Sequence, residues 1–321
     1  MKISILVSRL ATASLAAALA SCSLSTPAPG PGIHQSIDDT SQSPTLGSGA
    51  PAHATASGLL FVANVRNNAV DIYDKKPPFS LRGKITNGIV GPNGMIVDPH
   101  GDLIVANVDN QTVAVYAPGS KTPNKVYTQG FGRRLTNPLN VALGKDGTLY
   151  LVNYTQIGQA SEILEYAPGQ MKPSFRISLT GGAEGMALDA DNNLYVSYNA
   201  PSGGRILKFA PHSKNGKDLG ISLGFAGGLL LDDKQNLVVC DQTAPAVYVF
   251  PPGATKPSKT IKSAFVNPYH IAFGEHFKSL YLADSAGQVV FVYAYPSGTI
   301  AGTIQRKFAA FGVAVDPPAP I

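Results

Sequence analysis

Short hydrophobic segments separated by turn residues recur along most of the chain. The stretch from Pro92 to Gly119 shows the pattern: Gly94 to Asp98, Leu103 to Asn107 and Val113 to Tyr116 are rich in Val, Ile and Tyr, with Gly, Pro, Asn and Asp between them. Such short segments bounded by turn formers are typical of β-strands joined by hairpins. None of the three is long enough for a core helix. The pattern predicts an all-β chain, which the 33 glycines and 25 prolines also favour.

The second strand of this pattern recurs six times at nearly constant spacing. It begins at Leu60 (LFVAN), Leu103 (LIVAN), Leu149 (LYLVN), Leu194 (LYVSY), Leu237 (LVVCD) and Leu280 (LYLAD). The steps between these leucines are 43, 46, 45, 43 and 43 residues. A period of about 44 residues with about four strands per repeat is that of a propeller blade. The third strand recurs with an aromatic end suited to filling the space between blades, at Tyr73, Tyr116, Tyr166, Phe209, Phe250 and Tyr293.

The first strand of the repeat recurs with an offset that would close a ring. Its copies begin at Gly94, Asn140, Gly185, Gly228, His270 and Gly312. A first strand is therefore missing before Leu60 and left over after Tyr293. Pairing of Gly312 to Asp316 with Leu60 to Asn64 would complete one blade from both ends of the chain and remove two open sheet edges. The sequence predicts a six-bladed β-propeller with four-stranded blades over residues 58–321.

The repeat also resembles a known family. The segment PNGMIVDPHGDLIVANVDNQTVAVY, from Pro92 to Tyr116, resembles an NHL repeat. From about residue 58 to its end, the chain is similar to the six-bladed propellers of the NHL and gluconolactonase (senescence-marker-protein) superfamily. These motifs are short and degenerate, so the resemblance implies a fold more than a function. For the gluconolactonase-like enzymes it implies amide and carboxylate metal ligands just before the first strand of a blade.

Two rings of residues are expected around one end of the channel, where first strands begin and second strands end. The inner ring is Asn93, Leu139, Glu184, Gly227, Tyr269 and Phe311, and the outer ring is Asn64, Asn107, Asn153, Tyr198, Asp241 and Asp284. The resemblance implies that Asn93 and Glu184 bind a divalent cation (Ca²⁺, Zn²⁺ or Mn²⁺). Because Ca²⁺ takes about six to eight oxygen ligands and this ring has one carboxylate, we expect no cofactor. Outer-ring side chains are expected to bond the backbone of nearby loops.

Two connections at this end are longer than the others. Five residues join the second and third strands in four blades, but nine do so in blade three (Tyr154 to Glu162) and seven in blade four (Asn199 to Arg205). Longer loops on one side of a rigid ring often mark the ligand-binding side. The candidate ligand-binding residues are Asn93, Glu184, Tyr154, Tyr198, Asn199, Arg205, Tyr269 and His270. The opposite end carries Asp98, Asp189, Asp232 and Asp316, which are expected to cap the backbone of their own turns.

The N-terminal residues have the features of an export signal. Met1 to Arg9 is positively charged, Leu10 to Ala20 is apolar, and small residues follow. The segment Leu19-Ala20-Ser21-Cys22 resembles a bacterial lipoprotein box, which implies a signal peptide over residues 1–21 and a lipidated Cys22. Ordinary cleavage after Ala18-Leu19-Ala20 is the alternative and would give a secreted protein.

The second cysteine and the linker favour lipidation. Cys240 occupies a strand position that other repeats fill with Ala or Ser, so we expect it to be buried and not to form a disulfide. Cys22 would then have no disulfide partner, and lipidation would explain why an exported protein carries it. Residues 22–57 are rich in Ser, Thr, Pro, Gly and Ala, which predicts a disordered tether with a root-mean-square reach of about 30 to 35 Å.

Charge and motifs narrow the classes of function. Without Lys2 and Arg9 the chain carries 23 Lys and Arg against 20 Asp and Glu, too small an excess to indicate a nucleic-acid partner. The leading hypothesis is a non-enzymatic lipoprotein of the bacterial cell envelope. Its partners would be the membrane, through the N-terminal lipid, and a protein or small molecule bound at the channel mouth that bears Asn93 and Glu184. The alternative is a divalent-metal-dependent hydrolase such as a lactonase, with Glu184 and Asn93 as metal ligands.

Overall fold

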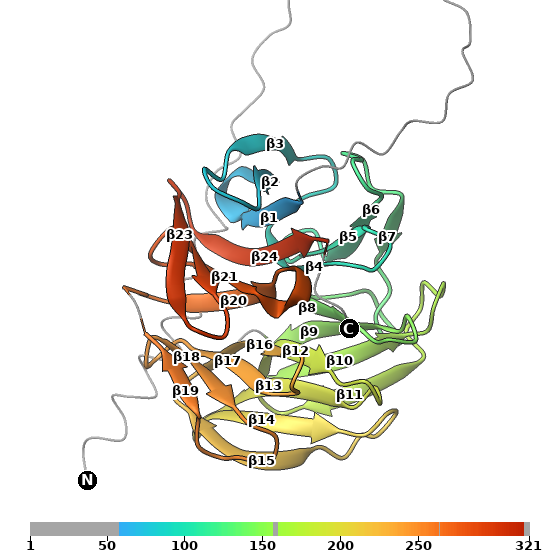
Figure 1. Cartoon of the computed structure of the whole chain (residues 1–321). Helices are drawn as coiled ribbons and strands as arrows, with labels where there is room; N and C mark the ends of the chain where they lie inside the picture. The colour runs from blue at the N-terminus through green and yellow to red at the C-terminus, as the bar shows by residue number, and fades with distance from the viewer. Residues whose placement is uncertain (1–57, 157–159, 263, 318–321) are drawn as a thin grey trace, which may run out of the picture.

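The computed structural model describes residues 58–156, 160–262 and 264–317. In these segments twenty-four strands form six four-stranded antiparallel sheets arranged around a central axis (Figure 1). Two 3₁₀ helices, η1 (Val65–Asn67) and η2 (Glu275–Phe277), are the helices found in those segments, and neither has the length to cross a membrane. The prediction of a six-bladed propeller is confirmed. The predicted signal peptide, Cys22 and the tether lie outside the described residues.

The blades are numbered from the N-terminus, and each is given from the axis outwards. Blade 1 consists of β24 (Ala310–Asp316), β1 (Leu59–Asn64), β2 (Ala69–Asp74) and β3 (Leu81–Ile85). Blade 2 consists of β4 (Pro92–Val97), β5 (Leu103–Asn107), β6 (Thr112–Tyr116) and β7 (Lys125–Tyr127). Blade 3 consists of β8 (Pro138–Leu143), β9 (Leu149–Gln156), β10 (Ala160–Tyr166) and β11 (Phe175–Leu179). Blade 4 consists of β12 (Gly182–Leu188), β13 (Leu194–Ala200), β14 (Gly203–Phe209) and β15 (Lys217–Leu223). Blade 5 consists of β16 (Ala226–Leu231), β17 (Leu237–Asp241), β18 (Ala246–Phe250) and β19 (Lys259–Ile261). Blade 6 consists of β20 (Pro268–Phe273), β21 (Ser279–Asp284), β22 (Val289–Ala294) and β23 (Thr299–Gln305).

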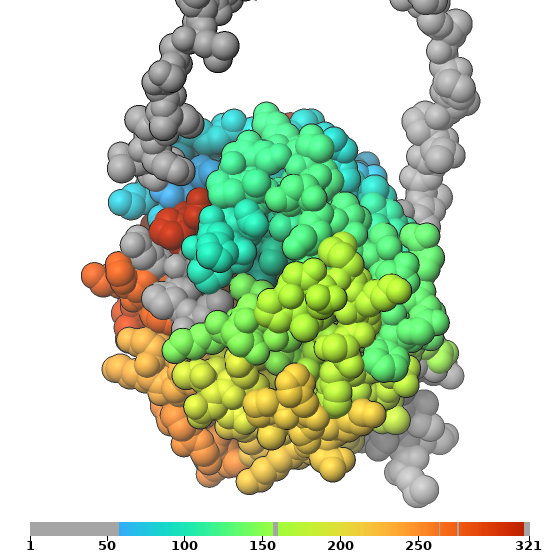
Figure 2. Space-filling view, turned by 90° about the vertical axis from the view of Figure 1, so that its right-hand side faces the viewer, coloured from blue at the N-terminus to red at the C-terminus, as the bar shows by residue number. Residues whose placement is uncertain are grey.

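The ring closes through blade 1, as the sequence predicts. Strand β24 pairs antiparallel with β1, with Leu59 opposite Asp316 and Leu60 opposite Val315. Figure 1 shows the red β24 beside the blue β1, and Figure 2 shows the blades following one another from cyan through green and yellow to orange and red. The two chain ends therefore complete one sheet, and the edges that β24 and β1 turn toward each other are paired instead of open.

Aromatic residues at the ends of the third strands fill the space between blades. Tyr116, Tyr166, Phe209 and Tyr293 are among the largest fully buried side chains. The Tyr116 hydroxyl donates a hydrogen bond to the Asn87 carbonyl at 2.7 Å, so the buried phenol is also satisfied. Cys240 is buried and free, as expected from its strand position.

The inner strands are irregular at one common height and approach each other closely there. Every pairing between an inner strand and its neighbour contains a register shift, from Pro92/Met95 in blade 2 to Pro268/His270 in blade 6. A Cβ on Gly185 would lie 2.5 Å from Leu229 N of the next blade. Glycine is needed at this position because the neighbouring backbone leaves no room for a side chain. We call this level the narrow height of the channel, because neighbouring inner strands approach each other closely there.

The longer connections expected in blades 3 and 4 are mostly strand. Tyr154 pairs with Ser161 in blade 3, and Asn199 pairs with Gly204 in blade 4. The expected nine- and seven-residue loops are therefore wrong as loops. Extended pairing satisfies the backbone groups that a loop would leave to solvent, so these hairpins project as ordered strands.

Candidate functional site

The inner-ring residues lie where the sequence predicts, but their side chains are buried. We call this end of the channel, where the inner strands begin, the Glu184 end. Glu184 is 1% exposed, and Tyr154 Oη donates a hydrogen bond to its Oε1 at 2.8 Å. Burial raises the pKa of Glu184 to about 7, although hydrogen bonds from Tyr154 and Tyr269 oppose the rise. Burial, with Glu184 beside it, also holds the pKa of Tyr154 well above its usual value.

The donors at this end suit a divalent cation poorly. Asn93 Oδ1 and Glu184 Oε2 are buried and have no hydrogen-bond partner, so two oxygens are available. Their ring neighbours Leu139 and Phe311 are buried apolar side chains. Within residues 58–156, 160–262 and 264–317, no group of three or more His, Cys, Asp or Glu residues could hold a metal ion. A Ca²⁺ ion needs about six to eight oxygens and Zn²⁺ about four ligands, so the residues present do not fit either ion.

The outer-ring side chains are engaged in the structure itself. Asn153 Oδ1 accepts hydrogen bonds from the backbone of Thr136 and Asn137, both at 3.0 Å. Asp241 accepts from Gly224 and Phe225 in the same way, and Asp284 accepts from Val266 and Asn267. These bonds fix the loop that leads into the inner strand of the same blade. The expectation that this ring is structural is confirmed at these positions.

The candidates on the blade 4 hairpin are also bonded to their surroundings. Asn199 donates to the carbonyl of Ala226 and accepts from its amide, both at 2.8 Å, which ties blade 4 to blade 5. Tyr198 is half-buried, and its hydroxyl lies 3.1 Å from Thr180 Oγ1. Arg205 Nη1 donates to the Gly204 carbonyl at 3.0 Å. The structure therefore brings these side chains near the Glu184 end, where each contacts neighbouring residues of the protein.

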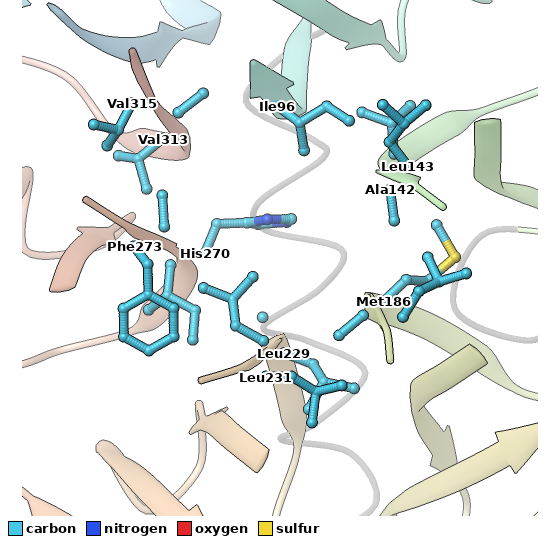
Figure 3. A pocket seen from close by; sticks show the side chains of 18 of the residues that line it. Ile96, Ala142, Leu143, Met186, Leu229, Leu231, His270, Phe273, Val313 and Val315 are labelled. Atoms are coloured by element: carbon cyan, nitrogen blue, oxygen red, sulfur yellow. The ribbon is translucent and has the colours of Figure 1, made fainter. Parts of the chain in front are cut away.

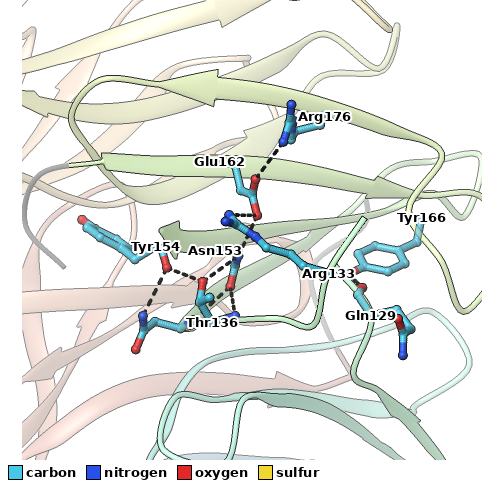
Figure 4. Close-up of polar contacts among 9 residues, drawn as sticks. Gln129, Arg133, Thr136, Asn153, Tyr154, Glu162, Tyr166 and Arg176 are labelled. Carbon is cyan, nitrogen blue, oxygen red and sulfur yellow. Dashed lines mark hydrogen bonds and ion pairs between the residues drawn. The ribbon is translucent and has the colours of Figure 1, made fainter. Parts of the chain in front are cut away.

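A carboxylate that the sequence analysis did not single out lies nearby in blade 3. Glu162 is 2% exposed and accepts hydrogen bonds from Asn153 Nδ2 at 2.8 Å and Arg133 Nη2 at 3.2 Å (Figure 4). Arg176 Nη1 lies 3.8 Å from its other oxygen. This buried charge is paired on both oxygens, which holds the loop before β8 against the β9–β10 hairpin.

At the opposite end, which we call the Asp232 end, the aspartates cap turns as predicted. Asp98 Oδ1 accepts from the amides of His100 and Asp102, each at 2.8 Å. Asp232 Oδ1 accepts from the amides of Lys234 and Asn236. Its other oxygen accepts from Tyr295 Oη at 2.7 Å and from Asn236 Nδ2 at 2.8 Å. Asp232 therefore joins blade 5 to blade 6 in addition to capping its turn.

A cavity of about 390 Å³ occupies the channel between the narrow height and the Asp232 end. All six inner strands line it, mainly with apolar side chains such as Ile96, Leu143, Met186, Leu229 and Val313 (Figure 3). Exposed residues of its lining, among them Ala190, Asp233 and Gln235, lie on the turns at the Asp232 end. Asn93 and Glu184 are not part of this lining. Its volume falls in the range of about 300 to 1,000 Å³ typical of small-molecule pockets.

His270 is the candidate residue that reaches this cavity. Its imidazole projects into the space in Figure 3, and the residue is 6% exposed. Its Nε2 has no hydrogen-bond partner. Burial lowers the pKa of His270 to about 4, so the ring is neutral near neutral pH. The sequence did not predict the cavity, because candidate residues were sought at the channel mouth that bears Asn93 and Glu184. The available signal was the repeated apolar first strand, in motifs such as GMIVD, GMALD and GVAVD, which places apolar side chains around the axis in every blade.

Solved structures confirm the fold and do not identify a family. No protein-family model matches the chain, and no curated protein matches it. A chain of a nidogen/laminin complex has a TM-score of 0.64 at 15% identity, covering 80% of this chain and 97% of that chain. A protein of unknown function from Bacteroides caccae has a TM-score of 0.61 at 12% identity, covering 81% and 99%. Hydrazine synthase of Kuenenia stuttgartiensis has a TM-score of 0.54 at 14% identity, covering 80% and 86%. The similarity is one of fold, and the NHL and gluconolactonase resemblance stays a prediction.

Proposed function

We propose that this protein is a non-enzymatic binding scaffold of the bacterial cell envelope that takes a small, largely apolar molecule into the central cavity. The cavity is the observation that carries the proposal: about 390 Å³ lined by apolar side chains from all six blades. Burial of apolar ligand surface there supplies the affinity. The rigid ring keeps the cavity formed without ligand, because each inner strand is hydrogen-bonded in its own sheet and packed on its neighbours.

The proposed location is the envelope, where lipidated Cys22 anchors the chain and residues 22–57 act as the tether. The lipoprotein-box resemblance and the composition of the linker support this arrangement. A tether of about 30 to 35 Å would hold the propeller clear of the lipid surface. Its outer surface would then be free to contact a second protein, and the nidogen/laminin complex provides an example of a similar fold in a protein complex.

Two measurements test this proposal. The full chain should be found in the membrane fraction and take up radiolabelled palmitate, whereas the chain expressed from Ser23 onwards should be soluble and unlabelled. A full chain that takes up no palmitate would contradict lipid anchoring. The soluble variant should also bind a fluorescent apolar probe with saturable, near one-to-one stoichiometry. An absence of saturable binding would contradict a ligand-binding cavity.

The hydrolase alternative has one observation in its favour, the unpartnered oxygens of Asn93 and Glu184 at the Glu184 end. Two oxygens are too few ligands for Ca²⁺ or Zn²⁺, so this alternative would need further ligands from water or substrate. Calorimetric titration of the soluble protein with Ca²⁺, Zn²⁺ and Mn²⁺ tests this alternative. Saturable binding that is lost in a Glu184→Gln variant would favour the hydrolase over the scaffold.

A further inference from the structure

The floor of the cavity is formed by two side chains at the narrow height of the channel. At this height, the inner strands of four blades carry glycine, namely Gly94, Gly185, Gly228 and Gly312, whereas blade 3 carries Asn140 and blade 6 carries His270. Blades 3 and 6 lie opposite each other in a ring of six. Both side chains line the cavity. They therefore present the deepest polar groups that a ligand entering from the Asp232 end would meet.

Only one of these polar groups lacks a hydrogen-bond partner within the protein. The Asn140 amide is engaged, because its Nδ2 donates to the Glu184 carbonyl and its Oδ1 accepts from the Val141 amide, both at 2.8 Å. Asp232, at the rim, has hydrogen bonds on both oxygens. His270 Nε2 has none. A buried polar atom without a partner costs stability, and a ligand that pairs with it recovers that loss.

We infer that His270 Nε2 anchors a neutral hydrogen-bonding group, above all a hydroxyl, of an otherwise apolar ligand; this inference rests on the proposed function. A neutral imidazole nitrogen is either a donor or an acceptor, depending on the tautomer. A hydroxyl pairs with it in both cases, because it donates and accepts. The apolar walls formed by residues such as Ile96, Leu229 and Val313 cover the rest of the molecule.

The charges that line the cavity disfavour an anionic ligand. No Lys or Arg is among the residues that line it, and the charged residues that do are Asp232 and Asp233. A carboxylate at His270 would be desolvated without a counter-ion, because burial keeps the imidazole neutral. The ligand class is therefore an uncharged alcohol, such as an aliphatic or alicyclic one.

The test compares three ligands of equal chain length on the chain expressed from Ser23 onwards, which needs no detergent. The ligands are n-octanol, n-octane and octanoate, and the affinity of each is measured by its displacement of a bound fluorescent apolar probe. The variant His270→Phe removes the nitrogen and keeps an apolar ring of similar size. His270→Gln keeps a neutral hydrogen-bonding group, and His100→Phe is the matched control at an exposed histidine outside the cavity.

Wild type and His100→Phe should bind octanol about tenfold more tightly than octane, the effect of one buried hydrogen bond, and octanoate most weakly. His270→Phe should lose the octanol preference with octane binding kept, and His270→Gln should retain most of it. Equal binding of octane and octanol by wild type, or an octanol preference that survives in His270→Phe, would overturn the anchor and leave the apolar cavity standing. If none of the three displaces the probe, both the anchor and the cavity proposal fail.

Discussion

Replacing Glu184 with Gln should stabilise the protein at alkaline pH. The carboxyl group is buried, and its pKa is about 7 instead of 4.5. A pKa raised in the folded state means that stability is fully present below the unfolded value of 4.5 and is lost as the pH rises through about 7. At about 1.4 kcal/mol per pKa unit, ionisation at about pH 8 costs the folded state about 3 kcal/mol. The Gln amide cannot ionise and keeps an oxygen for the Tyr154 hydroxyl, so it avoids this cost.

The measurement is denaturant unfolding of wild type and Glu184→Gln at about pH 5 and about pH 8. At about pH 5 the two should differ by less than about 1 kcal/mol, because the folded carboxyl is protonated there. At about pH 8 the variant should be more stable, by up to about 3 kcal/mol. Tyr154→Phe serves as the control for the lost hydrogen bond. If Glu184→Gln destabilises the protein at about pH 8, the carboxylate is ionised and compensated there, as a bound cation would make it.

Two further predictions concern ring closure and the Asp turns. Deleting the chain from Ala310 onwards removes β24, leaves an unpaired edge on β1 and exposes the core of blade 1. We therefore expect the truncated protein to aggregate and to lose cooperative melting. A truncated protein that stays monomeric and melts like the parent would contradict this closure. Asp98→Ala should cost about 1 kcal/mol through its lost turn bonds, and Asp232→Ala should cost about 1 to 2 kcal/mol more because it also leaves the buried Tyr295 hydroxyl unpaired. Equal losses of stability for the two variants, measured by chemical denaturation, would show that the bond between blades 5 and 6 contributes nothing.

The repeat spacing was enough to predict the fold. The second strand at Leu60 has no first strand before it, and the first strand at Gly312 has no second strand after it, so the two were expected to share a blade. Cys240 stands where other repeats carry Ala or Ser, which predicted that it is buried. Turn chemistry was equally readable, because the capping of Asp98 depends on neighbours four residues away at most. These features are set by local sequence or by a regular period.

The site was less predictable because it depends on how six distant strands meet. Tyr154 of blade 3 donates a hydrogen bond to Glu184 of blade 4, and no spacing in the sequence predicts that contact. The hairpins of blades 3 and 4 were taken for loops because the repeated strand motif ends at Asn153 and Tyr198, yet backbone pairing extends beyond both residues. The cavity follows from the combined size of the side chains of six inner strands, which only their arrangement in space reveals.

Binding of a fluorescent apolar probe to three soluble proteins tests the central claim most directly: the parent, Ala272→Phe and Tyr198→Ala. Ala272 is a half-buried residue of the cavity wall, so the larger ring should occupy the ligand's space. Tyr198 lies near the Glu184 end and does not line the cavity. We expect Ala272→Phe to weaken or abolish binding and Tyr198→Ala to bind like the parent, with both variants folded by circular dichroism. Binding that survives in Ala272→Phe and is lost in Tyr198→Ala would place the ligand at the Glu184 end and contradict a site in the cavity.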